Sequence, residues 1–310
     1  MKLVLNNSIL GILTSALLLG CGATGDQVSS EGFAVLGVDL DSPGTTIQIL
    51  DMSGQVLDLI ETDIIEPMGL SSRPGGDFIV TTETEVLRVT RSGDVSLFNQ
   101  DLLPWPSPRR VNTQPPPLFR VAVTESGEVT VTQEYDVTEW TEDGDLVMHT
   151  FVAGNYCWMD AALVAGSDKG VALLDVFGPT IAFWNGEADT FEDLAVGIGT
   201  DDFADIANIL GNDTSGNYYV ASSWGNEIYK VSAEGAITAL ASSTADGSIY
   251  DLADVSAINA IEPAGPESVF VLVESVSEGS SILRLDASTG ASTSIVTSED
   301  GLWLDLTLLN

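Results

Sequence analysis

The chain has few of the residue types that hydrolytic and zinc-dependent enzymes place at their sites. Its 310 residues include one histidine, His149, and two cysteines, Cys21 and Cys157. One histidine cannot supply a multi-histidine zinc site, and no Gly-x-Ser-x-Gly motif for an activated serine is present. His149 lies within Leu146–Phe151, whose pattern predicts an outer strand, so we expect it to be a structural surface residue. No catalytic residue and no metal ligand set is assigned on this basis.

Basic residues are also scarce. Ten Lys and Arg stand against 46 Asp and Glu, which gives a formal net charge of -36. A surface of this sign repels nucleic acid, so DNA and RNA are excluded as partners. An acidic surface keeps a protein soluble in salty surroundings. This is a simpler explanation of the net charge than a single acidic binding site. A hydrophobic content of 44% without long charge runs favours a folded chain.

No apolar run is long enough to be read as a membrane-spanning helix. Ile9–Leu19 follows the basic residue Lys2, has the length of a signal-peptide core, and leads into Leu18-Leu19-Gly20-Cys21. These four residues resemble the lipobox of bacterial lipoproteins. The resemblance implies cleavage after residue 20 and acylation of Cys21, and Gly22 in place of Asp implies sorting to the outer membrane. An ordinary secretory signal with a chance cysteine is the alternative.

The lipobox divides the chain into three parts: a signal peptide (1–20), the lipidated Cys21 with a polar tether (21–31), and a folded domain (32–310). About ten flexible residues span roughly 17 Å, so the domain is expected to stay close to the membrane. Lipidation of Cys21 leaves Cys157 without a disulfide partner, and a small buried side chain is the expected role for Cys157.

The folded domain is built from a repeat that Asn217–Leu240 shows most clearly as strand, loop, strand, glycine turn and strand. Such a unit cannot bury its own faces, whereas a radial stack of copies can. The glycine turns recur about every 47 residues, which is among the known blade periods. Six turns predict six blades: Ser53-Gly54, Ser92-Gly93, Asp143-Gly144, Asn185-Gly186, Glu234-Gly235 and Thr289-Gly290.

Each blade is expected to have four antiparallel strands, as in Met68–Ser72, Asp77–Thr82, Val86–Thr90 and Val95–Asn99. The first unit supplies only three strands, in Phe33–Leu40, Thr46–Leu50 and Val56–Glu61. Gly301–Leu308 is an apolar strand without a blade of its own. The sequence therefore predicts an all-β, six-bladed β-propeller whose first blade is closed by the C-terminal strand.

In repeat length and in the order of strand, glycine turn and strand, residues 32–308 resemble six-bladed propellers of the NHL-repeat and gluconolactonase-like superfamily. That resemblance implies a fold shared by binding proteins and by hydrolases that use a divalent ion. No stretch matches the hydrolases' metal-binding motif, so we expect no cofactor, with a divalent cation such as Ca²⁺ kept as the exception. The favoured function is a binding or scaffolding propeller, anchored through Cys21 on the periplasmic or cell-surface side of the envelope, with an envelope protein as partner. A metal-dependent lactonase or esterase and a purely structural protein are the alternatives.

A second periodicity marks four predicted inner strands, which share an apolar residue, any residue, and then Asp. The carboxylates are Asp160, Asp205, Asp254 and Asp305, whereas Leu70 and Arg120 hold this position in the other two blades. Because inner strands line the channel, the four carboxylates are expected to form a ring at one mouth. They either accept backbone N–H bonds between blades or hold a cation or polar ligand. The aromatic members of this candidate ligand site are Trp158, Trp224 and Trp303.

A proline-rich insertion, Leu103–Leu118, separates the second and third blades. Six of the ten basic residues lie between Arg73 and Arg120, and the insertion itself carries Trp105, Arg109 and Arg110. A basic, aromatic loop on an acidic protein is a candidate contact for a partner, and a rigid cover over the channel edge is the equal alternative.

Overall fold

The computed structural model describes residues 32–38, 44–82, 85–98, 120–133, 136–151, 158–163, 171–175, 180–185, 190–196, 209–221, 227–242, 255–275, 279–298 and 301–309. Within these ranges the chain forms 24 strands in six separate four-stranded sheets. None of the described residues belongs to a helix that is long and apolar enough to cross a membrane.

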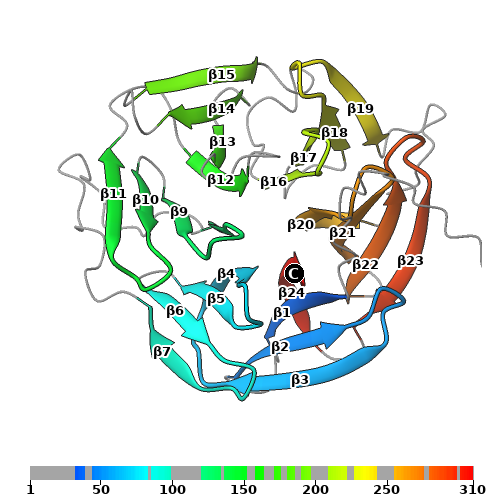
Figure 1. The fold of residues 1–310 in the computed structure, drawn as a ribbon. Coiled ribbons are helices and arrows are strands. Elements are labelled where there is room, and N and C mark those ends of the chain that lie inside the picture. Colours follow the sequence, from blue (N-terminus) through cyan, green and yellow to red (C-terminus); the bar gives the residue numbers. More distant parts are fainter. Residues whose placement is uncertain are drawn as a thin grey trace, which may run out of the picture.

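Each sheet is one blade, and the blades surround a central axis (Figure 1). Blade 1 has β24 (Leu302–Leu308) innermost, then β1 (Phe33–Val38), β2 (Thr45–Leu50) and β3 (Val56–Thr62). Blade 2 consists of β4 (Pro67–Ser72), β5 (Phe78–Thr82), β6 (Val86–Val89) and β7 (Val95–Leu97). Blade 3 consists of β8 (Arg120–Val123), β9 (Val129–Gln133), β10 (Asp136–Trp140) and β11 (Leu146–Phe151).

The other three blades follow the same order from the channel outward. Blade 4 consists of β12 (Trp158–Leu163), β13 (Val171–Asp175), β14 (Thr180–Asn185) and β15 (Thr190–Val196). Blade 5 consists of β16 (Ile209–Asn212), β17 (Tyr218–Ala221), β18 (Glu227–Val231) and β19 (Ile237–Ser242). Blade 6 consists of β20 (Val255–Pro263), β21 (Ser268–Ser275), β22 (Gly279–Asp286) and β23 (Ser292–Thr297). The prediction of four-stranded antiparallel blades is confirmed.

The C-terminal strand closes the ring. β24 pairs antiparallel with β1, and its register runs from Val38 opposite Leu302 to Phe33 opposite Leu308. Beyond the strand, the Leu309 N–H donates to the carbonyl of Gly32 at 3.0 Å, so the two ends of the folded domain lie side by side. This closure confirms the prediction made from the missing strand of the first unit.

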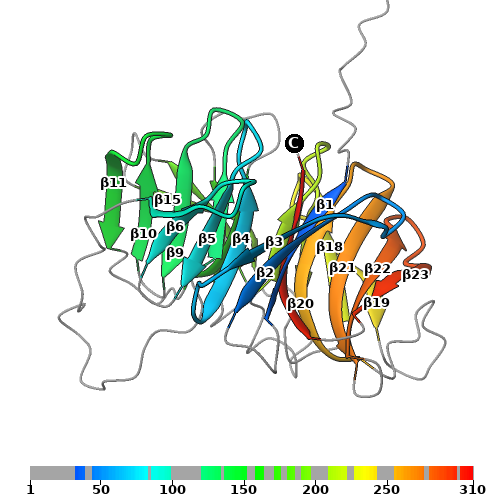
Figure 2. The same ribbon diagram turned by 90° about the horizontal axis from the view of Figure 1, so that it is seen from below.

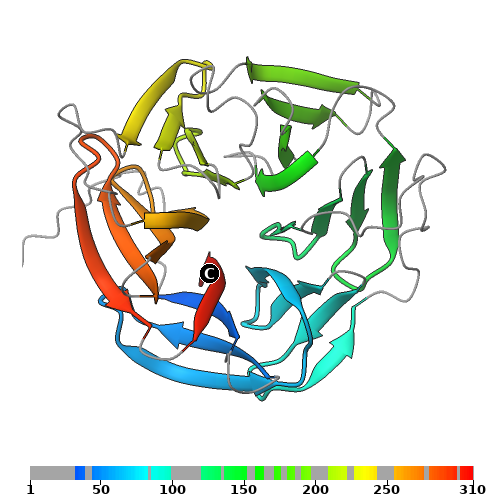
Figure 3. The same cartoon turned by 180° about the vertical axis from the view of Figure 1, so that it is seen from behind.

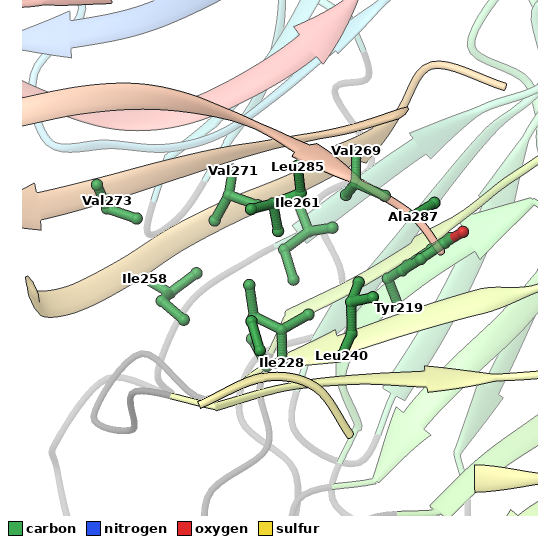
Figure 4. Packing of buried hydrophobic residues seen from close by; sticks show 12 residues of the cluster. Tyr219, Ile228, Leu240, Ile258, Ile261, Val269, Val271, Val273, Leu285 and Ala287 are labelled. Carbon is green, nitrogen blue, oxygen red and sulfur yellow. The ribbon is translucent and has the colours of Figure 1, made fainter. Parts of the chain in front are cut away.

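The hydrophobic core lies between neighbouring blades. Strands with apolar residues on both faces bury one face against each neighbour, which is how a radial stack removes the apolar area that single blades expose. Between blades 5 and 6, Tyr219, Ile228 and Leu240 pack against Ile258 and Val271 (Figure 4). Similar clusters join blades 1 and 2, 2 and 3, 4 and 5, and 6 and 1.

The ring has two distinct faces (Figure 2). We call one the turn face, because it carries the tight glycine turns such as Asp51–Gln55 and Asp213–Asn217. Gly32 and Leu309 also lie on this face, because Gly32 immediately precedes β1 and β1 pairs with the part of β2 that enters the turn Asp51–Gln55. The opposite face, called the loop face, carries the connection Asp63–Glu66 and the strand ends on either side of residues 99–119.

The outer-turn glycines have a second role that the repeat alone does not reveal. Gly144 and Gly290 have φ of +88° and +72°, as the turn requires. Each also packs against the preceding blade: a Cβ on Gly144 would lie 2.5 Å from the carbonyl oxygen of Phe98. A Cβ on Gly290 would lie less than 3.0 Å from the carbonyl oxygen of Leu240. The turns therefore act as contacts between adjacent outer strands.

Candidate functional site

Six inner strands surround the axis, and each contacts the inner strand of the next blade around the ring (Figures 1 and 3). Two of them carry residues of the predicted ligand site. Trp303 and Asp305 lie on β24, and Trp158 and Asp160 lie on β12, where the register shifts between those two residues. These residues of the predicted ligand site therefore lie on strands next to the axis of the ring.

Asp305 is buried, with 7% of its surface exposed. Its Oδ1 lies 3.0 Å from Nη1 of Arg120. Its Oδ2 accepts the N–H of Leu70 at 2.8 Å, and Oδ1 accepts the N–H of Leu306 at 2.9 Å. Since Leu70 is on β4 and Arg120 on β8, one carboxylate connects blade 1 to blades 2 and 3.

Arg120 continues this network to blade 6. Its Nη2 donates to the carbonyl of Asn259 on β20 at 3.0 Å. The side-chain Nδ2 of Asn259 donates in turn to the carbonyl of Trp303 at 3.0 Å. Blades 3 and 6 are opposite in the ring, so the guanidinium reaches across its axis. We call Arg120, Asp305 and Asn259 the axial network.

Burial dominates the electrostatics of Asp305. Desolvation raises the pKa of this carboxyl above its usual range, while the charge of Arg120 and the two backbone N–H groups act in the opposite direction. Arg120 keeps its charge at any pH that proteins tolerate. The two opposite charges therefore offset each other in a site that is almost completely closed to solvent.

Trp303 lies in the core between blades 6 and 1. It is 3% exposed and belongs to the same cluster as Phe33, Ala260 and Phe270. Its backbone N–H donates to Oγ of Ser280 at 2.9 Å. The packed indole ring of Trp303 thus supports the inner strand that carries Asp305.

The remaining predicted site residues are described only in part or not at all. For Trp158 and Asp160 the structure gives the strand but not the side chain, so the convergence of the four carboxylates stays a prediction. Within the described part of the chain, no three His, Cys, Asp or Glu side chains lie close enough to hold a metal ion. The residues outside the described ranges are Asp205, Asp254, Trp224, Trp105, Arg109, Arg110, Cys21 and Cys157.

A second buried carboxylate, Asp213, was missed by the analysis of the sequence. It is 1% exposed at the turn of blade 5, where it accepts the N–H groups of Ser215 and Asn217, both at 2.9 Å. It also accepts the hydroxyl of Tyr219 at 3.1 Å. Burial, followed by the charge of Asp213, raises the pKa of Tyr218 to about 12, and burial, the charge of Asp213 and the hydrogen bond to Asp213 raise the pKa of Tyr219. The signal was an Asp two residues ahead of Ser215 in a glycine turn, which is the spacing of an Asx turn.

No protein-family model and no curated protein matches this sequence. Solved structures do match. Virginiamycin B lyase from Staphylococcus aureus aligns with a TM-score of 0.55 and 14% identity over 86% of this chain and 85% of that one. A catalytically inactive histidine-to-alanine variant of that lyase, solved with quinupristin, gives 0.56 at 14% identity over 86% of this chain and 85% of that chain. TolB from Acinetobacter baumannii gives 0.62 at 10% identity over 90% of this chain and 67% of that one.

The likeness is one of fold alone. At these identities it shows that the chain is a β-propeller related in architecture to the streptogramin B lyases and to TolB, and it carries no residue roles.

Proposed function

We propose that the protein is a lipid-anchored propeller of the bacterial envelope that binds a partner protein. The observation that carries this proposal is Leu18-Leu19-Gly20-Cys21 at the end of the apolar segment Ile9–Leu19. Cleavage after residue 20 would make Cys21 the first residue of the mature chain. Several acyl chains on one cysteine, at about 0.8 kcal/mol per buried methylene, would hold the protein stably on a membrane.

The topology supports a particular orientation of this anchored domain. Gly32, the first described residue, lies on the turn face. The tether of about ten residues reaches roughly 17 Å, so the face that carries Gly32 would stay near the membrane. The turn face would therefore lie toward the bilayer and the loop face away from it. Residues 99–119, which include Trp105 and Arg109, connect the loop-face ends of blades 2 and 3 and would be accessible to a partner.

The axial network supports binding by a fixed surface. Arg120 and Asp305 join blade 3 to blade 1, and the contacts of Leu70 and Asn259 add blades 2 and 6. Four of the six blades are therefore hydrogen-bonded to one another at the axis. A scaffold held in this way keeps its inner strands at constant separations, and a preorganised surface loses less entropy when it binds.

Two variants test the proposal together. Cys21→Ser should move the protein from the membrane fraction to the soluble envelope fraction, because the acylated thiol is absent. Deletion of residues 104–117 should leave the protein in the membrane fraction and abolish the cross-linked partner that the wild type yields in intact cells. A wild type that is already soluble contradicts the anchor, and an unchanged cross-link contradicts the role of the insertion.

Small-molecule chemistry is the second candidate, favoured by the likeness to a lyase that has been solved with quinupristin. A lactonase or esterase with a bound divalent ion would likewise be an enzyme that acts on a small molecule. A reaction that needs an imidazole could use only His149, which lies on β11, the outermost strand of blade 3. Isothermal titration with Ca²⁺, followed by hydrolysis assays on a panel of lactones and esters, separates this candidate from a binding protein. Saturable Ca²⁺ binding with turnover would favour the enzyme.

A further inference from the structure

The exposed apolar side chains are concentrated on one blade. Of the eight large hydrophobic residues that are exposed in the described part of the chain, four lie between residues 56 and 65. They are Val56 (53% exposed), Leu57 (60%), Leu59 (49%) and Ile65 (71%). The other four are spread over blades 2, 3 and 5. Single exposed aliphatic residues are ordinary on protein surfaces, whereas a cluster of this kind marks a contact surface.

These residues lie on and just after β3, the outermost strand of blade 1. β3 is hydrogen-bonded to β2 along one edge, and in the described sheets no strand pairs with its other edge. Natural edge strands are usually protected by charged side chains, proline or short length. β3 has seven residues, Val-Leu-Asp-Leu-Ile-Glu-Thr, and Asp58 and Glu61 are its only charged residues. The outer strand β7 has only three residues, and β23 (Ser-Thr-Ser-Ile-Val-Thr) also lacks lysine and proline, but its exposed residues are Ser and Thr.

Hydrogen bonds tie the end of β3 and the connection that follows it to Thr45 on β2. Oγ1 of Thr45 donates to the carbonyl of Ile64 at 2.6 Å, and Oγ1 of Thr62 donates to the carbonyl of Thr45 at 3.2 Å. Glu66 has a φ of +54°, which is unusual for a residue with a side chain. Ile64 is buried while Ile65 points to solvent. The exposed Ile65 therefore extends the apolar edge at a fixed position.

The negative charge of residues 56–66 indicates which kind of partner can bind at this edge. Residues 56–66 include Asp58, Glu61, Asp63 and Glu66 and no basic residue. A second copy would bring the same acidic edge and another net charge of -36, so pairing of two β3 strands is opposed by repulsion. A strand in which Lys or Arg alternates with aliphatic residues complements both the carboxylates and the leucines.

We propose that the free edge of β3 binds an extended segment of a partner protein, with alternating aliphatic and basic side chains, as a fifth strand of blade 1. Main-chain hydrogen bonds to the edge of β3 would supply affinity. Contacts with Leu57 and Leu59 would supply selectivity for aliphatic side chains on one face of the strand, and Asp58, on the other face, would select basic ones. This surface is made of residues 56–65 and includes none of residues 99–119, so the inference does not depend on the proposed role of that insertion or on the lipid anchor.

A labelled heptapeptide, Lys-Val-Lys-Val-Lys-Val-Lys, tests the proposal by fluorescence anisotropy with the full-length protein. The double variant Leu57→Thr and Leu59→Thr keeps strand-forming residues but removes the aliphatic surface, and should weaken binding roughly tenfold or more. The matched control, Leu146→Thr with Val147→Thr, changes two residues of similar exposure on β11 and should bind as the wild type does. Equal melting temperatures would show that all three proteins are folded.

Two further arms separate strand addition from other events. The same peptide with alternate backbone nitrogens methylated keeps its charge but loses main-chain donors, and should not bind. Binding of the methylated peptide as tightly as the unmodified one, or equal weakening by both double variants, overturns the proposal. Sedimentation equilibrium of the protein alone is expected to show a monomer. A wild-type dimer that becomes a monomer in the double variant Leu57→Thr and Leu59→Thr would mean that a second copy occupies the edge of β3. That result also overturns the proposal.

Discussion

Replacing Asp305 with asparagine should destabilise the propeller far more than the loss of any surface charge. The substitution leaves Arg120 charged and almost completely buried, and it replaces an oxygen that accepts the N–H of Leu70 with a group of weaker or wrong polarity. Removing one partner of a buried ion pair costs about 3–5 kcal/mol. Domains are usually stable by only about 5–15 kcal/mol, so this loss is a large part of the total.

Thermal unfolding followed by circular dichroism at pH 7 measures the effect. With roughly 2 °C per kcal/mol for a large domain, the melting temperature of Asp305→Asn should fall by about 6–10 °C. Glu142→Gln is the control, because it removes the same charge from a pair in which Glu142 is 63% exposed and 3.9 Å from Arg73. That change should cost about 0–1 kcal/mol. Equal shifts for the two variants would refute the idea that Arg120 depends on Asp305.

Three other outcomes are expected. Deleting residues 301–310 removes the inner strand of blade 1 and should yield an unfolded or aggregated chain; a truncated protein that melts within a degree or two of the full length would contradict the closure. Gly290→Ala should lower the urea midpoint more than Gly265→Ala, because both glycines have positive φ but only Gly290 packs against the preceding blade. Stability should fall as the pH rises from 10 to 12, because unfolding releases Tyr218 to ionise near pH 10 while its folded pKa is about 12. The loss is about 3 kcal/mol for Tyr218 alone. Urea midpoints that are equal at pH 9 and 11 would contradict this expectation.

The repeat and its closure could be predicted because they depend on local patterns. Alternating apolar residues and glycine turns predict strands and hairpins, and counting strands in the first unit showed that one was missing. β24 supplies that strand, as expected from Gly301–Leu308. His149 also lies on the outermost strand of its blade, as its pattern predicted.

The axial network could not be predicted, because it joins residues that are far apart in the chain. Arg120 stands where four other inner strands have Asp, and the sequence showed this only as an exception to the pattern. The structure shows that the exception supplies the countercharge for Asp305, 185 residues away along the chain. A charge of opposite sign at an equivalent position of a closed repeat is a signal that could have suggested the pair.

The outer-turn glycines illustrate a similar limit. Gly144 was predicted as a turn residue, which accounts for its φ of +88°. Its approach to the carbonyl of Phe98 depends on the distance between two blades, and that distance is set by the packing of the whole ring. A turn signal in one blade carries no information on the neighbouring strand.

Intact mass spectrometry of the protein extracted from cell envelopes tests the central claim most directly. An anchored lipoprotein predicts a mature chain that begins at Cys21 and carries acyl groups on that residue. A chain that begins elsewhere, or that retains an unmodified Cys21, would contradict the account of this propeller as a membrane-anchored binding protein.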